Sequence, residues 1–261
     1  MNSDLGSAVD FLDGHNLKVN AAKTQPIIIG SNRFVNVLDQ MQISNVLVCD
    51  TAVPYCDSVI NLGLTFDRTI SWKNHINLVV RKSYSILAQC RRNFSCLPLE
   101  IRKKIVSSLI FPIMDYGISA LTNMDDQVAR TLQKAQNSCI RFITGAKPWE
   151  HITPYYKQLE WLKIKDRQRL AVSLQIWKII KLNNPSYLYN QYIFVSEVNV
   201  RINRSNPNRL QVPLHRTETY AKSFFVTSCK LWNAFELYKY INYSSPVAVR
   251  NHLTKIMVSE L

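Results

Sequence analysis

The sequence predicts an α+β chain that is mostly helical, and three observations predict it. Short apolar runs of β character fill the first 72 residues. After them, apolar residues recur at the three- and four-residue spacing of amphipathic helices. The 261 residues are 47% hydrophobic and 19% charged, which is typical of a folded chain with room for more than one domain. We therefore expect three parts, at residues 1–72, 73–148 and 149–261.

The first part is expected to hold one helix and several strands. Residues 2–13 carry apolar side chains at helical spacing, and Gly14 suits the C-terminal cap. Residues 16–31 read NLKVNAAKTQPIIIGS and predict a β-hairpin whose turn carries Lys23. Further β-like runs are predicted at residues 33–38, 43–49 and 58–66.

The second part is expected to consist of three helices. The first covers residues 72–92. The second begins at Pro98, because proline suits the first turn of a helix, and it must bend or end at Pro112. The third runs over residues 125–144 and stops at Gly145. The inner stripe of the second helix is predicted to contain Ile101, Ile105 and Leu109.

The third part is expected to be helical, with one irregular stretch. A helix starts at Thr153-Pro154, and Asp166 is placed to cap the next one. Residues 183–213 are rich in Asn and Pro and lack periodicity, so they predict a linker or a long loop. Helical character returns over residues 217–237.

The net charge of +14 is unevenly distributed along the chain. Residues 1–72 have 4 basic and 7 acidic side chains, residues 73–148 have 12 and 4, and residues 149–261 have 16 and 7. Such asymmetry indicates a polyanionic partner, of which nucleic acid is the commonest. A basic surface that is merely solvated is the alternative.

The third predicted helix is the best candidate for contact with nucleic acid. At about 100° per residue, Arg130, Lys134, Asn137 and Arg141 fall within roughly 60° of one another. Such a stripe, flanked by Gln133 and Gln136, could track a phosphate backbone, although an ordinary solvated face has the same spacing. The helices before it add the candidate binding residues Arg81, Lys82, Arg91, Arg92, Arg102, Lys103 and Lys104.

Several kinds of chemistry lack a motif in the sequence. Six cysteines are scattered without a CxxC pair, and five histidines lack metal-ligand spacing. The adjacent carboxylates Asp125 and Asp126 are better explained as the start of a helix than as a metal site. No phosphate loop, nucleophile elbow or dinucleotide fingerprint occurs. We expect no metal, cofactor or membrane span in this chain, and an intracellular location in the nucleus or cytoplasm.

Six collinear segments resemble the reverse transcriptases of non-LTR retrotransposons, especially the jockey-like elements. The first is HNLKVNAAKTQPIIIGS, which is similar to the stretch that follows the catalytic aspartates in that family. The second is INLGLTFDRTISWKNHI, similar to YLGxxxDxxLxWxxHI. The third is LPLEIRKKIVSSLIFPIMDYG, similar to LPxxxRxxLYxSxIxPxLDYG, and the fourth is LQKAQNSCIRFITGAK, similar to LQxxQNxxIRxITG. The last two are TPYYKQLEWLKIKDR, similar to TPxxxLxxLxIxxR, and the stretch over residues 201–233, whose family pattern ends in RTxxYxxSFxxxxxxxWN.

The resemblance implies a role for each part of the chain. Residues 1–72 would be a partial polymerase palm, with Lys23 as general acid toward the pyrophosphate leaving group and with Leu62 and Gly63 in the primer grip. Residues 73–148 would be a thumb that holds the template–primer, and residues 149–261 a helical C-terminal domain. The expected function is that of the C-terminal fragment of an RNA-directed DNA polymerase.

The family's catalytic aspartates are the main departure from this pattern. None of the acidic residues here matches them, so we expect them upstream, in a missing N-terminal polymerase region. Without those carboxylates the Mg²⁺ ions of the full-length polymerase cannot be placed, and the chain alone is expected to be inactive. Two alternatives stay open: a retained, non-catalytic nucleic-acid-binding protein, and a helical protein–protein adaptor.

Overall fold

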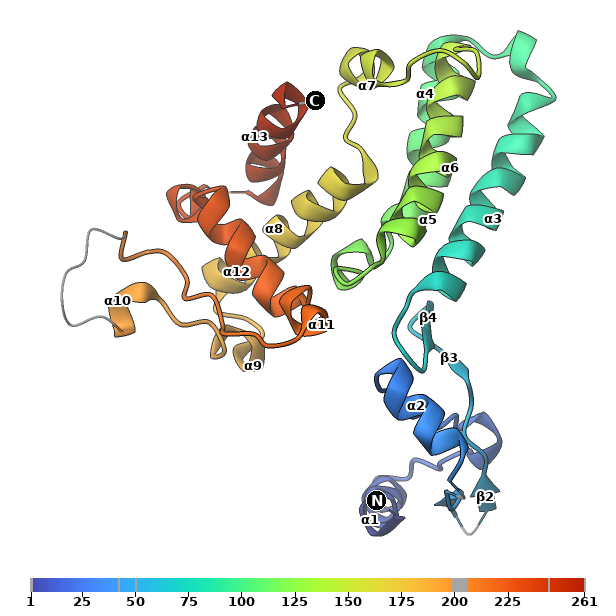
Figure 1. Ribbon diagram of the computed structural model, residues 1–261, viewed down its shortest axis with the longest axis vertical. Coiled ribbons are helices and arrows are strands. Elements are labelled where there is room, and N and C mark those ends of the chain that lie inside the picture. Colours follow the sequence, from blue (N-terminus) through green and yellow to red (C-terminus); the bar gives the residue numbers. More distant parts are fainter. Residues whose placement is uncertain (1, 42, 50, 199–205, 244, 261) are drawn as a thin grey trace. The chain divides into compact units, whose positions relative to one another are not determined.

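The computed structural model confirms a mostly helical α+β chain with two small antiparallel sheets (Figure 1). It describes residues 2–41, 43–49, 51–198, 206–243 and 245–260. The chain divides into two compact units, Met1–His75 and Ile76–Leu261. The predicted boundary after residue 148 falls inside the second unit, in which helices from both sides of that boundary pack together.

The first unit begins with the predicted helix, but the segment after it differs from the prediction. Helix α1 spans Asn2–Gly14. The hairpin predicted over residues 16–31 is wrong, because Asn20 caps a short 3-10 helix, η1 (Ala21–Lys23), through a 3.2 Å hydrogen bond from the Lys23 N–H. Residues 24–30 follow without regular structure and make isolated backbone hydrogen bonds, Cys56 N–H to Pro26 O and Gly30 N–H to Arg68 O.

The run predicted as a strand at residues 33–38 is a helix. Helix α2 spans Asn32–Asp39, and the hydroxyl of Ser31 accepts a hydrogen bond from the Phe34 N–H at 3.3 Å. A serine at this position satisfies one of the free N–H groups at the start of a helix. The β-branched residues of the run suggested a strand, yet this cap and the spacing of the apolar residues favour a helix.

The two sheets of the first unit are separate hairpins. Strand β1 (Val46–Val48) pairs with β2 (Thr51–Val53), and their valines bury a small cluster. The prediction at residues 43–49 is therefore correct only in its second half. The run at residues 58–66 is not one strand but two, β3 (Ser58–Asn61) and β4 (Leu64–Asp67). Leu62 and Gly63 form the two-residue turn between them, both with positive φ, as a type I′ hairpin turn requires.

Asp67 closes the turn that leads from β4 into helix α3 (Lys73–Arg91). Its carboxylate accepts hydrogen bonds from the N–H and hydroxyl groups of Thr69 and Ser71 at 2.7–3.0 Å. Partial burial acts to raise the pKa of Asp67, but these hydrogen bonds outweigh it and hold the pKa below its usual value. The turn orients Trp72, which is buried just before α3 begins.

The first helices of the second unit follow the predicted order. The bounds of α3 and α6 lie within one residue of the prediction, but the helix between them is interrupted by a π-helical segment, η3. The elements after α3 are η2 (Phe94–Cys96), α4 (Leu99–Ile105), η3 (Val106–Ile110), α5 (Phe111–Asp115), η4 (Ile118–Ala120) and α6 (Asp126–Thr144).

The predicted inner stripe of the α4 region is wrong. Ile101 and Leu109 are 44% and 52% exposed, whereas Val106 and Ile110 are buried. The π-helical segment lies just before Pro112, a residue that has no N–H to donate to the helix. The wider turn of this segment rotates the side chains around the helix axis and so changes which of them face the core.

Helix α8 is the central element of the rest of the unit. It spans Ile164–Leu182 and follows α7 (Thr153–Leu159). The prediction that Asp166 caps this helix is wrong. Asp166 lies in the first turn of α8 and pairs with Arg169 at 3.2 Å. The remaining elements are α9 (Ser186–Tyr189), α10 (Val195–Val198), α11 (Glu218–Ala221), α12 (Phe224–Ala234), η5 (Leu237–Tyr240) and α13 (Pro246–Ser259).

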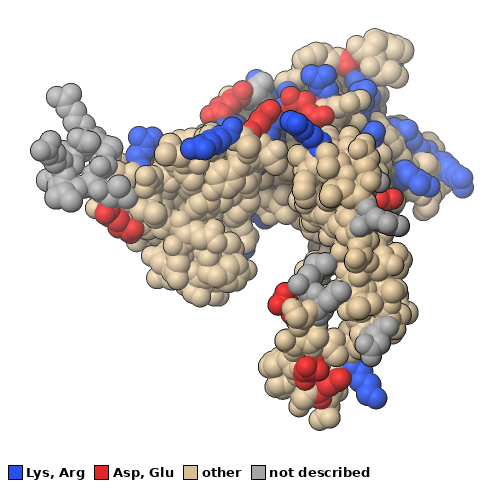
Figure 2. Space-filling model, turned by 60° about the horizontal axis from the view of Figure 1, so that its bottom comes forward, with Lys and Arg blue, Asp and Glu red and all other residues tan. Residues whose placement is uncertain are grey.

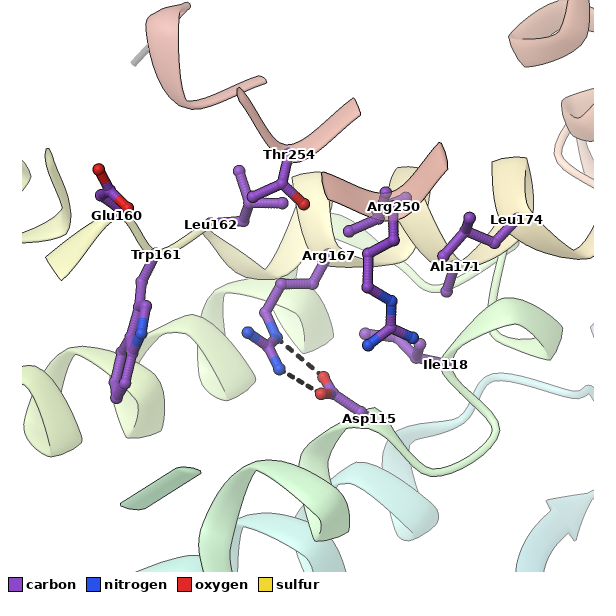
Figure 3. Close-up of a pocket in the computed structure, with 11 residues that line it drawn as sticks. Asp115, Ile118, Glu160, Trp161, Leu162, Arg167, Ala171, Leu174, Arg250 and Thr254 are labelled. Atoms are coloured by element: carbon purple, nitrogen blue, oxygen red, sulfur yellow. Dashed lines mark hydrogen bonds and ion pairs between the residues drawn. The ribbon is translucent and has the colours of Figure 1, made fainter. Parts of the chain in front are cut away.

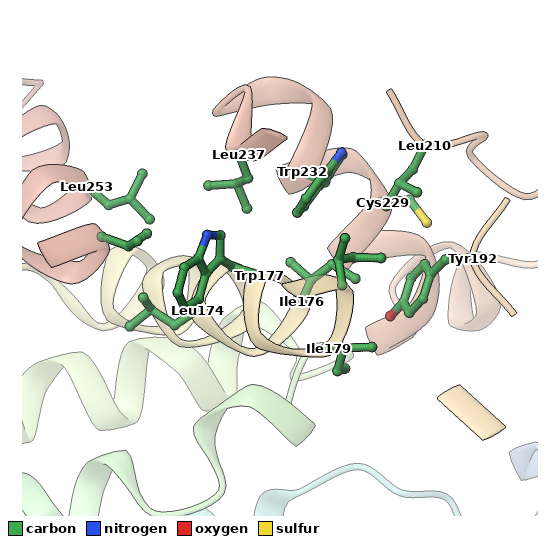
Figure 4. Close-up of a cluster of buried hydrophobic side chains, with 12 residues drawn as sticks. Leu174, Ile176, Trp177, Ile179, Tyr192, Leu210, Cys229, Trp232, Leu237 and Leu253 are labelled. Atoms are coloured by element: carbon green, nitrogen blue, oxygen red, sulfur yellow. The ribbon is translucent and has the colours of Figure 1, made fainter. Parts of the chain in front are cut away.

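A core cluster joins α8, α12 and α13, and Figure 4 shows the side chains of Trp177, Trp232 and Leu253 converging in it. The stretch predicted as a linker, residues 183–213, contributes Tyr192 and Leu210 to this core. Some of its described residues are therefore packed against this core, while residues 199–205 lie outside the described part. No helix in the described residues is long and apolar enough to cross a membrane.

Candidate nucleic-acid interface

Most of the predicted binding cations lie at the surface of α3, α4 and α6. Among the described residues, none of the exposed ones has an ion-pair partner. Figure 2 shows Lys and Arg side chains on the second unit, with some Asp and Glu among them, while the acidic side chains of the first unit are all Asp. Lys103 is half-buried, and the exposed cations are Arg81, Lys82, Arg91, Arg92, Lys104, Arg130 and Lys134.

Helix α3 presents Arg81 on the side opposite its buried face, and Arg92 directly follows the last residue of the helix. The two arginines are eleven residues apart, which corresponds to about 16 Å at the rise of a helix. Ile76 and Leu87 lie on the other side, each 1% exposed. The spacing of the two arginines spans several phosphates of one strand, which are separated by a few ångströms each.

The surfaces of α3 and α6 meet at Tyr84. Its hydroxyl lies 3.4 Å from the hydroxyl of Ser138, near the middle of α6. Lys134 is one turn before Ser138 and is exposed. Arg81 on α3 and Lys134 on α6, each about one turn from this contact, therefore lie on neighbouring helices.

The cationic stripe predicted on α6 is only half present. Arg130 and Lys134 are exposed, but Arg141 is half-buried and donates hydrogen bonds to the chain itself. Its Nε reaches the carbonyl oxygen of Lys147 at 3.3 Å, and its Nη2 reaches those of Pro148 and Glu150 at 3.2 and 3.3 Å. Arg141 thus holds the loop after α6 and is not available as a free cation.

The polar residues of the predicted stripe serve the interior. The Gln133 amide donates to the hydroxyl of Tyr156 at 2.7 Å and to Asn137 Oδ1 at 2.9 Å, and its oxygen accepts the Ile164 N–H at 2.9 Å. Gln136 is fully buried and donates to the carbonyl oxygen of Leu162 at 2.9 Å. These bonds join α6 to α7 and to the start of α8. Burial raises the pKa of Tyr156, so its hydroxyl stays protonated.

Arg102 is a second predicted binding residue that the fold uses internally. Its guanidinium stacks on Phe94 at 4.2 Å from the ring centroid and donates to the carbonyl oxygen of Phe142 at 3.1 Å. Phe94 also packs edge-on against Phe142, with ring centroids 5.9 Å apart. These contacts bring η2, the start of α4 and the end of α6 together. We therefore exclude Arg102 and Arg141 from the exposed cationic surface.

The predicted catalytic and primer-grip residues lie in the first unit. Lys23 ends η1 and its side chain is exposed. Leu62 and Gly63 form the tip of the β3–β4 hairpin, where Leu62 is 83% exposed. Among the described residues, no group of three or more His, Cys, Asp or Glu could hold a metal ion.

A groove that sequence reasoning missed lies between α5, α8 and α13 (Figure 3). Its cavity measures about 290 Å³. Arg167 forms a two-pronged ion pair with Asp115, and its guanidinium stacks on Phe111 at 4.2 Å. Arg250 reaches from α13 toward Ile118 and Asp115, and it has no ion-pair partner among the described residues. The groove thus combines a cation with an apolar floor. The only signal in the sequence was that Asp115 lies two residues before the end of one segment that resembles the polymerase family, and that Arg167 ends another.

Comparisons with known proteins identify no relative of this chain. Neither a model of a known protein family, nor a curated protein, nor a solved structure matches the chain.

Proposed function

We propose that residues 73–148 hold template–primer nucleic acid, and that the chain is the C-terminal part of a non-LTR retrotransposon reverse transcriptase. The observation that carries the proposal is the set of seven exposed cations on α3, α4 and α6, none with an ion-pair partner among the described residues. Lysines and arginines that neutralise phosphates release condensed counterions, which gives affinity without sequence preference. A thumb that must slide along any template needs that kind of affinity.

The contacts among the resembling segments support a common architecture with the polymerase family. Asp115, in the third segment, pairs with Arg167, in the fifth. Gln136, in the fourth, accepts a hydrogen bond from Tyr156, in the fifth, at 3.0 Å. Trp232 and Asn233, which end the sixth, bond to the backbone of Asn208 and Leu210 within the same segment. Residues that the resemblance marks are thus largely those that hold the helices together.

The division of labour between these residues and the exposed cations fits a nucleic-acid-holding domain. Internal polar networks hold α6 against α7 and the start of α8, and Arg102 ties the start of α4 to the end of α6, so the exposed cations of α4 and α6 are carried by helices that are fixed to one another. A rigid array of charges loses little conformational entropy when it meets a regular phosphate backbone. The roles of Lys23 as general acid and of Leu62 and Gly63 in the primer grip are part of the same proposal.

A salt titration of binding tests the proposal directly. The full chain would be titrated with a fluorescently labelled RNA–DNA hybrid of about 16 base pairs at several KCl concentrations. We expect log K to fall linearly with log[KCl], with a slope near one unit for each phosphate contact. The variant R81A/R92A/K134A should flatten the slope by about two to three units.

The matched control removes the same charge elsewhere in the second unit. Lys157, Lys230 and Lys255 are exposed on α7, α12 and α13, and none has an ion-pair partner among the described residues. The variant K157A/K230A/K255A should change the slope by less than one unit. Equal slopes for both triple variants would show that net charge, and not this surface, drives binding. An affinity that is independent of salt would contradict the proposal and favour a protein–protein adaptor.

A further inference from the structure

The loop between α6 and α7 displays a tryptophan to solvent. Trp149 is 78% exposed, whereas Trp72, Trp177 and Trp232 are at most 3% exposed and Trp161 is half-buried. Building on the function proposed above, we propose that Trp149 is a stacking platform for an unpaired base at the end of the bound duplex. Sequence reasoning assigned no role to this residue.

The exposure of Trp149 does not come from a loose loop. Arg141 donates three hydrogen bonds to carbonyl oxygens on both sides of the tryptophan, at 3.2–3.3 Å. The Glu150 N–H donates to the Lys147 carbonyl at 3.1 Å and closes a turn around residues 147–150. The Glu150 carboxylate accepts a 2.6 Å hydrogen bond from the Tyr155 hydroxyl, which anchors the far side of the loop. The fold therefore holds the loop in place while leaving the indole in water.

The surroundings of the indole match a nucleotide. The Lys147 ammonium lies over one face of the Trp149 ring, 5.4 Å from its centroid. A base can stack on the other face of the exposed indole while this cation binds a nearby phosphate of the same strand. A protein partner with an apolar patch would gain nothing from Lys147, so charge favours nucleic acid as the occupant.

The position of the loop fits the end of a duplex that follows α6. Lys134 and Arg141 are seven residues apart, so Arg141, which holds the loop, lies about 10 Å along the helix from the exposed lysine. The contacts of Phe94 with Arg102 and Phe142 bring η2, which follows Arg91 and Arg92, to the same end of α6. A strand that leaves the cationic surface at this end meets Trp149 next.

Hybrids with and without an overhang test the inference. The full chain would be titrated with a blunt RNA–DNA hybrid and with the same hybrid carrying three unpaired thymidines. We expect the overhang to strengthen binding by about 5- to 100-fold, the range for stacking one base on an aromatic side chain. It should also quench tryptophan fluorescence, because Trp149 is the most exposed of the five tryptophans.

Substitutions of Trp149 separate stacking from general binding. Trp149→Ala should remove the advantage of the overhang and leave the affinity for the blunt hybrid within about twofold. Trp149→Phe should keep most of the advantage but lose the quenching. Tyr187, 68% exposed on α9, provides the control, and Tyr187→Ala should behave as wild type.

Each remaining outcome has a distinct meaning. Equal affinities of the wild type for blunt and overhanging hybrids would overturn the inference and leave the proposed function intact, provided that blunt binding is salt-dependent. The same conclusion would follow if Trp149→Ala weakened both hybrids equally. The absence of any salt-dependent binding to the blunt hybrid would overturn the proposed function first, and the stacking platform with it.

Discussion

The two halves of α6 use similar side chains for different purposes. In the first half, Arg130 and Lys134 project into solvent without ion-pair partners among the described residues. In the second half, Gln136 donates to the Leu162 carbonyl just before α8, Asn137 accepts a hydrogen bond from Tyr156 of α7, and Arg141 donates to the loop after α6. Gln133, between the two exposed cations, also serves the interior, through Tyr156 and the start of α8. The comparison teaches that the angle of a residue around a helix does not by itself reveal its role. Neighbouring elements cover only part of the length of the helix, so residues at similar angles can be exposed in one place and bonded to the interior in another.

The largest expected effect comes from the buried half of α6. Gln136→Leu would leave the Leu162 carbonyl without its donor and remove an acceptor of the Tyr156 hydroxyl, in a site with no exposure. We expect a loss of about 2–4 kcal/mol in the free energy of unfolding, because buried polar groups lose their partners. Urea denaturation followed by circular dichroism measures it. The control Lys134→Leu, two residues away on the exposed side, should lower stability by less than about 0.5 kcal/mol.

Arg141→Ala should have the next largest effect on the free energy of unfolding, and it should loosen the loop after α6 while leaving the core packing in place. Three hydrogen bonds to carbonyl oxygens would be lost, which we expect to cost about 1–3 kcal/mol. The loop should then exchange its amide hydrogens faster, and hydrogen-exchange mass spectrometry over residues 145–151 would detect it. Arg130→Ala removes the same charge from the same helix and should leave this exchange unchanged. Equal protection in the two variants would show that Arg141 does not anchor the loop.

Lys134→Ala should affect binding and not stability. One phosphate contact fewer lowers the salt slope for the hybrid by about one unit, while the denaturation midpoint stays the same. Asn137→Ala is the useful contrast, because it should weaken the interior network without changing the slope. If Asn137→Ala flattened the slope as much as Lys134→Ala, the division of α6 into an exposed and an interior half would be wrong.

The smallest expected effect concerns pH at the start of α6. A hydrogen bond from Lys165 at 2.8 Å, with the charge of that lysine, holds the pKa of Asp126 below its usual value. A lowered pKa in the folded state stabilises the fold above the unfolded pKa, and that stabilisation disappears as the pH falls through the folded value. Wild type and Asp126→Asn should therefore differ slightly in stability at pH 7 and converge at low pH. Denaturation curves at pH 7 and pH 3 measure this convergence.

Local signals predicted α6 well and residues 16–31 badly, for one physical reason. The bounds of α6 depend on groups within a turn of its ends: Asp125 accepts the Asp126 N–H at 2.7 Å, and Gly145 adopts φ of 77°. The conformation of residues 16–31 depends instead on Asn20, which caps η1, and on backbone hydrogen bonds to residues 56 and 68, which are distant in the sequence. Periodicity carries no information about such distant partners, and so a hairpin was predicted where none forms.

The sequence by itself determined that the chain is α+β and mostly helical, where α3 and α6 begin and end, and where the positive charge is concentrated. These properties depend on composition, on apolar spacing and on caps, all of which act over a few residues. Only the tertiary structure decided which cations remain free. Arg102 and Arg141 point toward carbonyl oxygens that are 40 and six to nine residues away, whereas Arg81, Arg92 and Lys134 meet no such acceptor among the described residues. Packing brings these acceptors within reach: the Phe142 carbonyl lies in the last turn of α6, and the other three lie in the loop that follows it, where no helix supplies their hydrogen bonds.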